Sequence, residues 1–393
     1  MDTIFAMTDD LLRFRPEFPI VEKTIYMISN SLGAMPRGVR DELNHYADTW
    51  ASRGVRAWEE AWWMLPAEVG DEIGELMNAP KGSVSVHQNV TTCQAMVGSC
   101  FDFKGKRNKI VYSELNFPSV MYYWEAQRRY GARVHMVKTD DGISVPTERL
   151  LDAIDEETLI VPISHVIFRS SYIKDVPAIV EKAHKVGALV CLDMFHSLGC
   201  MPVDIRKLDV DFATGGVLKW LCGGPGTCYL YAKPELANKL EPAFTGWTAH
   251  SNPFNFEIGP QRYTDMPYRF MTGTTNIPAL HAAKPGLRII KEAGAANIRA
   301  KSKRQTAKLI ELADARGWRV NTPRDPERRG GTVSIDMPNA KEVAAELNRR
   351  DVVVDWRPKA GVRFSPHFYT KDEELSLAIS VVEEILNKMA VKA

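Results

Sequence analysis

The feature that most constrains this chain is an alternation of short apolar runs with helical patterns between residues 84 and 232. Each run is rich in branched and aromatic side chains and is bounded by Gly, Pro, Asn or Asp, a pattern typical of buried strands. The predicted strands are NKIVYSEL (108–115), ARVHMVKT (132–139), LIVPISHV (159–166), ALVCLDMF (188–195) and TCYLYA (227–232).

Helical periodicity fills the gaps between these runs, for example in residues 119–131 and 176–187. The second of these segments ends on Gly187, and glycine is the residue expected just past a helix end. The order strand, helix, strand predicts an α/β fold with a mostly parallel sheet covered on both faces. Ligands of such folds bind at the carboxyl ends of the strands.

The flanking regions predict a second, smaller α+β domain. Residues 279–318 have helical patterns, and two strand-like runs and an amphipathic helix (372–390) follow them. We therefore expect an N-terminal segment (1–40) that packs with the small domain, a large ligand-binding domain (41–278) and a small C-terminal domain (279–393).

Charge and composition exclude several classes of protein. Fifty Lys and Arg oppose 49 Asp and Glu, which gives no reason to expect nucleic acid as a partner. No stretch approaches the roughly 18 apolar residues of a membrane span, and the first residues carry acids where a signal peptide carries bases. We expect a cytoplasmic protein. The six cysteines lack metal-ligand spacing and several lie in apolar runs, so we expect buried free thiols and no metal site.

The strongest chemical pattern is Asp193-x-x-His196 at the end of a predicted strand, followed by Lys219 in a stretch of small residues. A carboxylate buried at the end of an apolar strand needs a positive partner, and a protonated pyridine nitrogen would be one. An apolar environment lowers the pKa of a lysine and so favours a Schiff-base nucleophile. Pyridoxal phosphate (PLP) requires this pair of groups from a protein.

Each of these residues also has an ordinary structural interpretation. Asp193 could cap a helix, His196 could be a core histidine, and Lys219 could extend to the surface. Thr91 and Thr92 precede an apolar helical run, where hydroxyls either cap the helix or help its N-terminus bind a phosphate. Their combination on one α/β chain favours the phosphate and the cofactor.

The sequence resembles the class V aminotransferase group of PLP enzymes, which have fold type I, and within it the kynureninases. The matching segments are 25–40, 52–80, NFPSV (116–120), SHVIFRSSYIKD (164–175), LDMFHSLGCMPVDI (192–205), LKWLCGGPG (218–226), GWTAHSNPFNFE (246–257), RFMTGTTN (269–276) and GVRFSPHFYTKDEEL (361–375). The resemblance implies an enzyme that cleaves the Cβ–Cγ bond of an amino acid with water and releases alanine and an aromatic acid.

The resemblance also assigns roles to individual residues. It makes Lys219 the Schiff-base lysine and proton shuttle, Asp193 the partner of the pyridinium with His196 beside it, and Phe117 the ring that stacks on the cofactor. It assigns the phosphate to Thr91, Thr92 and Ser164, with Trp247 and Thr274 reaching the phosphate of a neighbouring subunit in a homodimer. It gives the substrate α-carboxylate to Arg363 in a bidentate contact, and the aromatic part of the substrate to His250 and Asn276.

Three positions depart from the kynureninase pattern. Leu218 and Trp220 flank Lys219 where tyrosines are usual, Val120 replaces an aspartate, and Ser170-Ser171 replaces Thr-Gly. The first two changes keep open an alternative, a class V aminotransferase or a Cβ lyase acting on a different amino acid. A non-catalytic relative is disfavoured because Lys219, Asp193 and Arg363 are all present.

Overall fold

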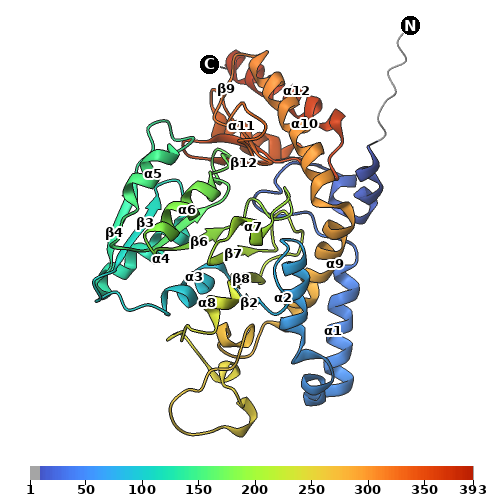
Figure 1. The fold of residues 1–393 in the computed structure, drawn as a ribbon. Helices are drawn as coiled ribbons and strands as arrows, with labels where there is room; N and C mark the ends of the chain where they lie inside the picture. Colours follow the sequence, from blue (N-terminus) through green and yellow to red (C-terminus); the bar gives the residue numbers. More distant parts are fainter. Residues whose placement is uncertain (1–8, 393) are drawn as a thin grey trace.

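The computed structural model describes residues 9–392, and its central element is a seven-stranded sheet of order β2-β8-β7-β6-β5-β3-β4 (Figure 1). Its strands are β2 (Val84–His87), β3 (Lys109–Ser113), β4 (Arg133–Val137), β5 (Thr158–Ser164), β6 (Leu189–Asp193), β7 (Phe212–Gly216) and β8 (Cys228–Ala232). The pairs from β4 to β7 are parallel, and β8 runs antiparallel to both β2 and β7. The predicted α/β class is thereby confirmed, and β2 and β7 are additional strands that the sequence pattern did not predict.

Helices cover both faces of this sheet, because successive strand residues point to opposite sides. Ile110 packs into an apolar cluster with α3 and α4, whereas its neighbour Val111 belongs to the larger cluster on the other face. The helices of the large domain are α1 (Val39–Arg53), α2 (Leu65–Glu75), α3 (Val90–Gly98), α4 (Pro118–Ala126), α5 (Thr147–Ala153), α6 (Val176–Lys185), α7 (Ile205–Leu208) and α8 (Pro234–Ala237). As expected, α6 ends before Gly187, which has a positive φ of 74°.

The C-terminal region builds a four-stranded antiparallel sheet of order β12-β13-β10-β9 with its own apolar core. Its elements are α10 (Ala295–Asp314), β9 (Arg319–Val320), β10 (Val333–Asp336), α11 (Ala340–Arg349), β11 (Val352–Val353), β12 (Asp355–Arg357), β13 (Gly361–Phe364) and α12 (Asp372–Lys392). In Figure 1 this region, coloured orange to red, lies at the upper end of the molecule.

Two elements join the regions. Strand β1 (Ile25–Tyr26) pairs in parallel with β11 of the C-terminal region. Helix α9 (Ile277–Ala293) lies beside α1 (Figure 1), and its apolar side chains belong to the core of the large sheet. The expected domain boundary at residue 278 stays a prediction, and this packing argues for placing it at the end of α9.

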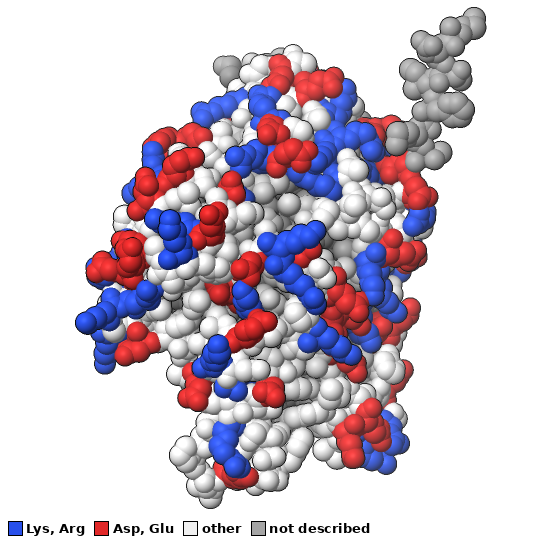
Figure 2. Space-filling view, in the orientation of Figure 1, with Lys and Arg blue, Asp and Glu red and all other residues white. Residues whose placement is uncertain are grey.

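The surface is mixed in charge. Figure 2 shows acidic and basic side chains interspersed over the displayed face, whereas the projection at its lower end is mostly uncharged. That projection contains the loop of residues 244–262, where Phe254, Phe256 and Ile258 are exposed. Within the described part of the chain, no helix is both long and apolar enough to cross a membrane. Five of the six free cysteines are buried and Cys100 is partly exposed.

Candidate active site

Lys219 lies in the loop that follows β7 and faces a histidine. Its Nζ atom is 2.9 Å from Nε2 of His196 and lies over the rings of Phe117 and Phe195, at 5.3 and 4.9 Å from their centroids. Burial lowers the pKa of Lys219 to about 8. Burial also lowers the pKa of His196 well below its ordinary value, and the positive charge of Lys219 adds to this. A neutral imidazole therefore holds an amine that can lose its proton near neutral pH.

Asp193 ends the neighbouring strand β6 and is 4% exposed. Its carboxylate accepts hydrogen bonds from the backbone N–H of Phe195 at 3.0 Å and the hydroxyl of Ser164 at 3.4 Å. Burial raises its pKa, against the lowering effects of the Phe195 hydrogen bond and the charge of Lys219, and among the described side chains none forms an ion pair with it. A buried carboxylate without a positive partner is costly. The protonated ring nitrogen of PLP supplies the missing charged donor, so this site fits the cofactor.

Ser164 lies where strand pairing puts it. Ser164 and Asp193 are aligned across the parallel pair β5 and β6, which brings the hydroxyl to the carboxylate. This contact differs from the phosphate contact expected for Ser164. The difference arises because the register of β5 against β6 places Ser164 opposite Asp193, and the sequence of one strand does not reveal this register.

The expected phosphate site is the N-terminus of α3. Asn89 caps this helix by accepting from the backbone N–H of Thr92 at 3.0 Å and from the Thr92 hydroxyl at 3.3 Å. Thr91 is exposed in the first turn. The cap is therefore Asn89, and the Thr91 hydroxyl lies at a helix start that favours an anion.

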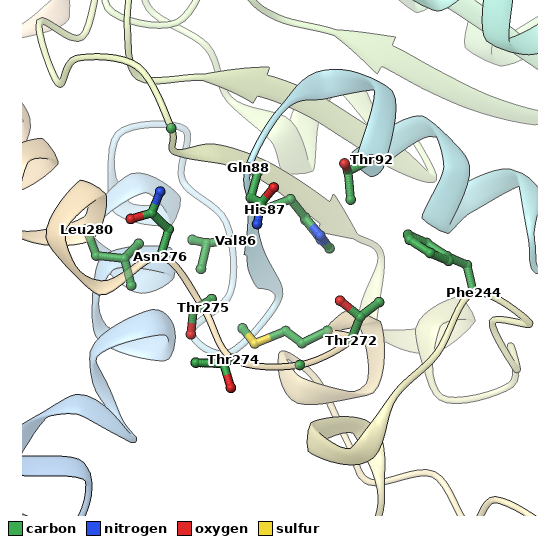
Figure 3. Close-up of a pocket in the computed structure, with 13 residues that line it drawn as sticks. Val86, His87, Gln88, Thr92, Phe244, Thr272, Thr274, Thr275, Asn276 and Leu280 are labelled. Atoms are coloured by element: carbon green, nitrogen blue, oxygen red, sulfur yellow. The ribbon is translucent and has the colours of Figure 1, made fainter. Parts of the chain in front are cut away.

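A cavity of about 220 Å³ opens beside this helix start (Figure 3). Thr92 contributes to its wall, and across from it lie Thr274 and Asn276, from the segment that leads into α9. The Asn276 side chain caps α9 by accepting from the N–H of Ala279 at 3.3 Å. The structure thus brings three of the expected site residues together around one polar space.

An aromatic cavity of about 300 Å³ adjoins this one, because Thr274 and Thr275 line both. Its other walls are mainly aromatic, and they come from the α1–α2 connection and the 247–268 loop: Trp58, Trp62, Trp63, Trp247, Phe254 and Tyr268. His250 lies in that loop, where its Nδ1 accepts from the N–H of Asn252 at 3.0 Å. Within one chain, the structure does not bring His250 to Lys219.

Arg363 is 2% exposed and already engaged. Its Nε and Nη2 donate to the two carboxylate oxygens of Asp355 at 2.7 and 2.5 Å. Nη2 also donates to the Ser31 hydroxyl at 3.2 Å, and Nη1 donates to the carbonyl of Phe168 at 2.6 Å. The bidentate edge expected to hold a substrate carboxylate is thus taken by Asp355. A guanidinium has five N–H groups, so one N–H, on Nη1, remains without a partner in the described chain.

The sequence reasoning missed Ser31, Asp355 and Phe168. Asp355 lies directly across the β12–β13 pair from Arg363. Burial raises the pKa of Asp355, but the hydrogen bonds and charge of Arg363 outweigh burial and leave that pKa lowered. The Phe168 ring contacts that of Phe117 edge-on at 5.4 Å, which connects the Arg363 group with the Lys219 group. Ser31 lies in segment 25–40, which carried the resemblance, but no motif marked its hydroxyl.

The departures from the kynureninase pattern have structural counterparts. Val120 is 1% exposed in an apolar cluster, an environment that suits valine and not a carboxylate. Ser171 has a positive φ of 63°, a conformation that favours glycine, and its hydroxyl accepts from the N–H of Thr332 at 3.1 Å, a bond that glycine cannot make. The Leu218 carbonyl accepts from the N–H of Gly33 at 2.8 Å.

Fold and site together define a PLP-dependent enzyme of fold type I. The family model of class V aminotransferases matches residues 25–376, and the chain belongs to this family. Kynureninases of Shouchella clausii and Pseudomonas fluorescens are each 30% identical to it, over 98% and 97% of this chain and 93% of each relative. An uncharacterized aminotransferase of Bacillus subtilis, YcbU, is 28% identical over 94% of this chain and 96% of its own.

Solved structures agree with this fold. The apo cysteine desulfurase of Thermococcus onnurineus superposes with a TM-score of 0.86 at 22% identity, over 96% of this chain and 98% of that one. A variant of the protein C-DES, with glycine covalently linked to its PLP, gives 0.84 at 17% identity, over 94% and 98%. The resemblance to class V PLP enzymes is thereby confirmed, and PLP is the cofactor of this chain.

Proposed function

We propose that this enzyme hydrolyses the Cβ–Cγ bond of a kynurenine-type α-amino acid and releases alanine and an aromatic acid. The observation that carries the proposal is the pairing of the Lys219 amine with a neutral His196 beside the unpaired carboxylate of Asp193. The similarity to kynureninases over nearly the whole chain supports the choice of reaction.

Each residue has a role that follows from its surroundings. Bound PLP supplies the sink for the electrons left at the substrate Cα. Lys219 links the cofactor and then moves the Cα proton, for which a pKa of about 8 is suited. His196 orients the Lys219 amine, and Asp193 keeps the ring nitrogen of the cofactor protonated. Phe117 covers the ring face, and Thr91 and Thr92 contribute to the phosphate site.

The proposal includes a homodimer with shared sites. Trp247 and Thr274 would reach the phosphate held by the neighbouring subunit. Trp247 is 40% exposed, and Phe256 and Ile258 of the same loop are 73% and 104% exposed, which suits a surface that a second copy covers. His250 and Asn276 would then face the aromatic part of the substrate in the dimer. The cytoplasmic location stays part of this proposal.

One observation favours the alternative, an aminotransferase or Cβ lyase acting on another amino acid. Leu218 offers no hydroxyl at a position next to Lys219 where kynureninases have a tyrosine. The absence of the tyrosine hydroxyl removes a hydrogen-bond donor to the phosphate and a group that helps proton transfer. A reaction that does not need that hydroxyl would tolerate the change.

A product assay separates these reactions. Purified holoenzyme is incubated with kynurenine or 3-hydroxykynurenine, with and without pyruvate, and the products are identified by mass. We expect alanine and the aromatic acid in equimolar amounts without pyruvate. Turnover that requires pyruvate would identify an aminotransferase, and loss of a β-substituent with formation of a keto acid would identify a lyase.

A further inference from the structure

The turn formed by residues 28–33 passes between the two halves of the active site. At one end Ile28 pairs with Ser365, two residues after Arg363. At the other end the N–H of Gly33 donates to the carbonyl of Leu218, the residue before Lys219. The turn closes on itself through the N–H of Ser31, which donates to the carbonyl of Ile28 at 2.8 Å.

Asn30 lies in the middle of this turn, and its side chain has no partner. It is 1% exposed, yet neither its Nδ2 nor its Oδ1 makes a hydrogen bond within the described chain. Both neighbours are satisfied: the Ser29 hydroxyl bonds that of Tyr369 at 2.7 Å, and the Ser31 hydroxyl donates to Asp355 at 2.6 Å. Burying an amide without hydrogen bonds is unfavourable, so the unpartnered side chain of Asn30 calls for a ligand.

The contacts that Arg363 already makes indicate which chemical group of a ligand would bind Asn30. Asp355 takes its bidentate edge and also pairs with Arg357 at 3.1 Å, so the group keeps one net positive charge, yet Arg363 itself offers only a single free N–H. A carboxylate bound here needs a second directed donor. Asn30 lies next to Ser31, which contacts both members of that pair, and its Nδ2 is a donor without an acceptor.

We infer that Asn30 binds the α-carboxylate of the substrate through Nδ2, together with the free N–H of Arg363, while Asp355 and Ser31 position the guanidinium. The inference rests on the proposed function only in taking the substrate to be an α-amino acid. According to this inference, Asn30 makes the enzyme bind a substrate with a free α-carboxylate more tightly than an analogue with an uncharged carboxamide.

The test compares two probes that differ only in the carboxylate. L-Alanine and L-alaninamide are titrated calorimetrically into the holoenzyme and into the variants Asn30→Ala, Asn30→Asp and Ser29→Ala. We expect Asn30→Ala to raise the Kd of L-alanine about tenfold, the effect of losing one hydrogen bond to a charged group. The Kd of L-alaninamide should rise less, because its neutral carbonyl oxygen accepts a weaker hydrogen bond than a carboxylate does. Asn30→Asp should weaken L-alanine further, because it places a carboxylate against a carboxylate.

Ser29→Ala is the matched control, since it removes a buried hydrogen bond from the same turn but leaves Asn30 in place. It should keep the preference for L-alanine. Thermal unfolding gives a second readout: a ligand-binding Asn30 makes no bond in the free protein, so Asn30→Ala should not lower the Tm.

Two results would overturn the inference. One is a wild-type protein that binds L-alanine no better than L-alaninamide. The other is an Asn30→Ala variant that weakens both probes equally or neither, whether the reason is a purely structural role or a bound water. The ratio of the two Kd values does not depend on kynurenine turnover, so failure of the proposed reaction would appear separately, in the product assay.

Discussion

Gly33 lies so close to the backbone of Lys219 that a Cβ atom at position 33 would come within 2.1 Å of the Lys219 carbonyl oxygen. The same Cβ would meet the Cα of Cys222 at 2.9 Å. The N-terminal turn is therefore packed directly against the loop that contains Lys219. This contact fixes the backbone of Lys219 and thereby helps to position its side-chain amine.

Replacing Gly33 with alanine should consequently displace the Lys219 loop. Overpacking of this kind costs about 1–3 kcal/mol, and here the obstacle is backbone, which cannot rotate away. We expect a lower Tm, measured by thermal unfolding, and a higher Kd for PLP, measured by cofactor titration. Gly105→Ala is the control, because its nearest contact would be 3.8 Å away. Equal behaviour of the two variants would contradict the proposed close packing.

Lys219→Ala should abolish both turnover and the lysine-linked chromophore. Borohydride reduction of the wild-type protein followed by peptide mapping should place the pyridoxyl group on Lys219. Lys174→Met is the matched control, since Lys174 also has a lowered pKa but is more fully buried and donates to the hydroxyl of Ser113 at 2.9 Å. A pyridoxyl group found on any other lysine would refute the assignment.

Lys174 should make the stability of the protein depend on pH. Burial lowers its pKa from 10.5 to about 7, so between these values the unfolded chain binds a proton that the folded chain does not. Stability therefore rises with pH in this window, by about 1.4 kcal/mol per pH unit. Lys174→Met removes this contribution. Its stability advantage over the wild type, measured by urea unfolding at pH 7, 8 and 9, should shrink as the pH rises; a constant difference would argue against a buried, titrating amine.

Leu218→Tyr should restore a phosphate donor and tighten the binding of PLP about tenfold. Leu218 is partly exposed, which leaves room for the ring, and its backbone bond to Gly33 is unaffected by the side chain. Any kynurenine hydrolysis should rise as well. Leu218→Phe has the same ring without the hydroxyl and should do neither. If both variants tighten PLP equally, the ring and not the hydroxyl is responsible.

Mixing inactive subunits should test the shared sites. A Lys219→Ala subunit combined with a Trp247→Ala subunit should recover about a quarter of the wild-type activity, since half of the dimers are mixed and each contains one intact site. Lys219→Ala with Arg363→Ala should recover none, because one chain brings both residues together through Phe117 and Phe168. A monomer in sedimentation at assay concentration would rule out the dimer.

The sequence predicted the strands whose pattern is local. The runs at 108–115, 159–166 and 188–195 are strands β3, β5 and β6, because apolar, branched residues define them without reference to the rest of the chain. Strand β7 was missed because it ends in Gly215 and Gly216. A Cβ at Gly215 would meet the hydroxyl of Tyr229 at 2.2 Å, and one at Gly216 would meet the ring of Phe195 at 2.4 Å, so contacts with side chains elsewhere in the chain require glycine at both positions.

The same distinction applies to the site. Asp193, His196 and Lys219 were predicted from their spacing, and the structure brings the three close together; their assignment to the cofactor stays a prediction. The engagement of Arg363 by Asp355 depends on the register of an antiparallel pair, which the pattern of either strand alone does not reveal. The lack of a hydrogen-bond partner for the Asn30 side chain depends on which residues the fold packs around it, and the local sequence does not show this.

The pairing of β1 with β11 has a consequence for how the enzyme is made. Synthesis proceeds from the N-terminus, so Ile25–Tyr26 leave the ribosome long before their partners Val352–Val353. Ser31 and Gly33 follow β1 closely, and they lie beside Arg363 and Lys219. A polypeptide released before residue 363 would lack the proposed carboxylate-binding group, so the proposed active site can be completed only after both ends of this pair have been made.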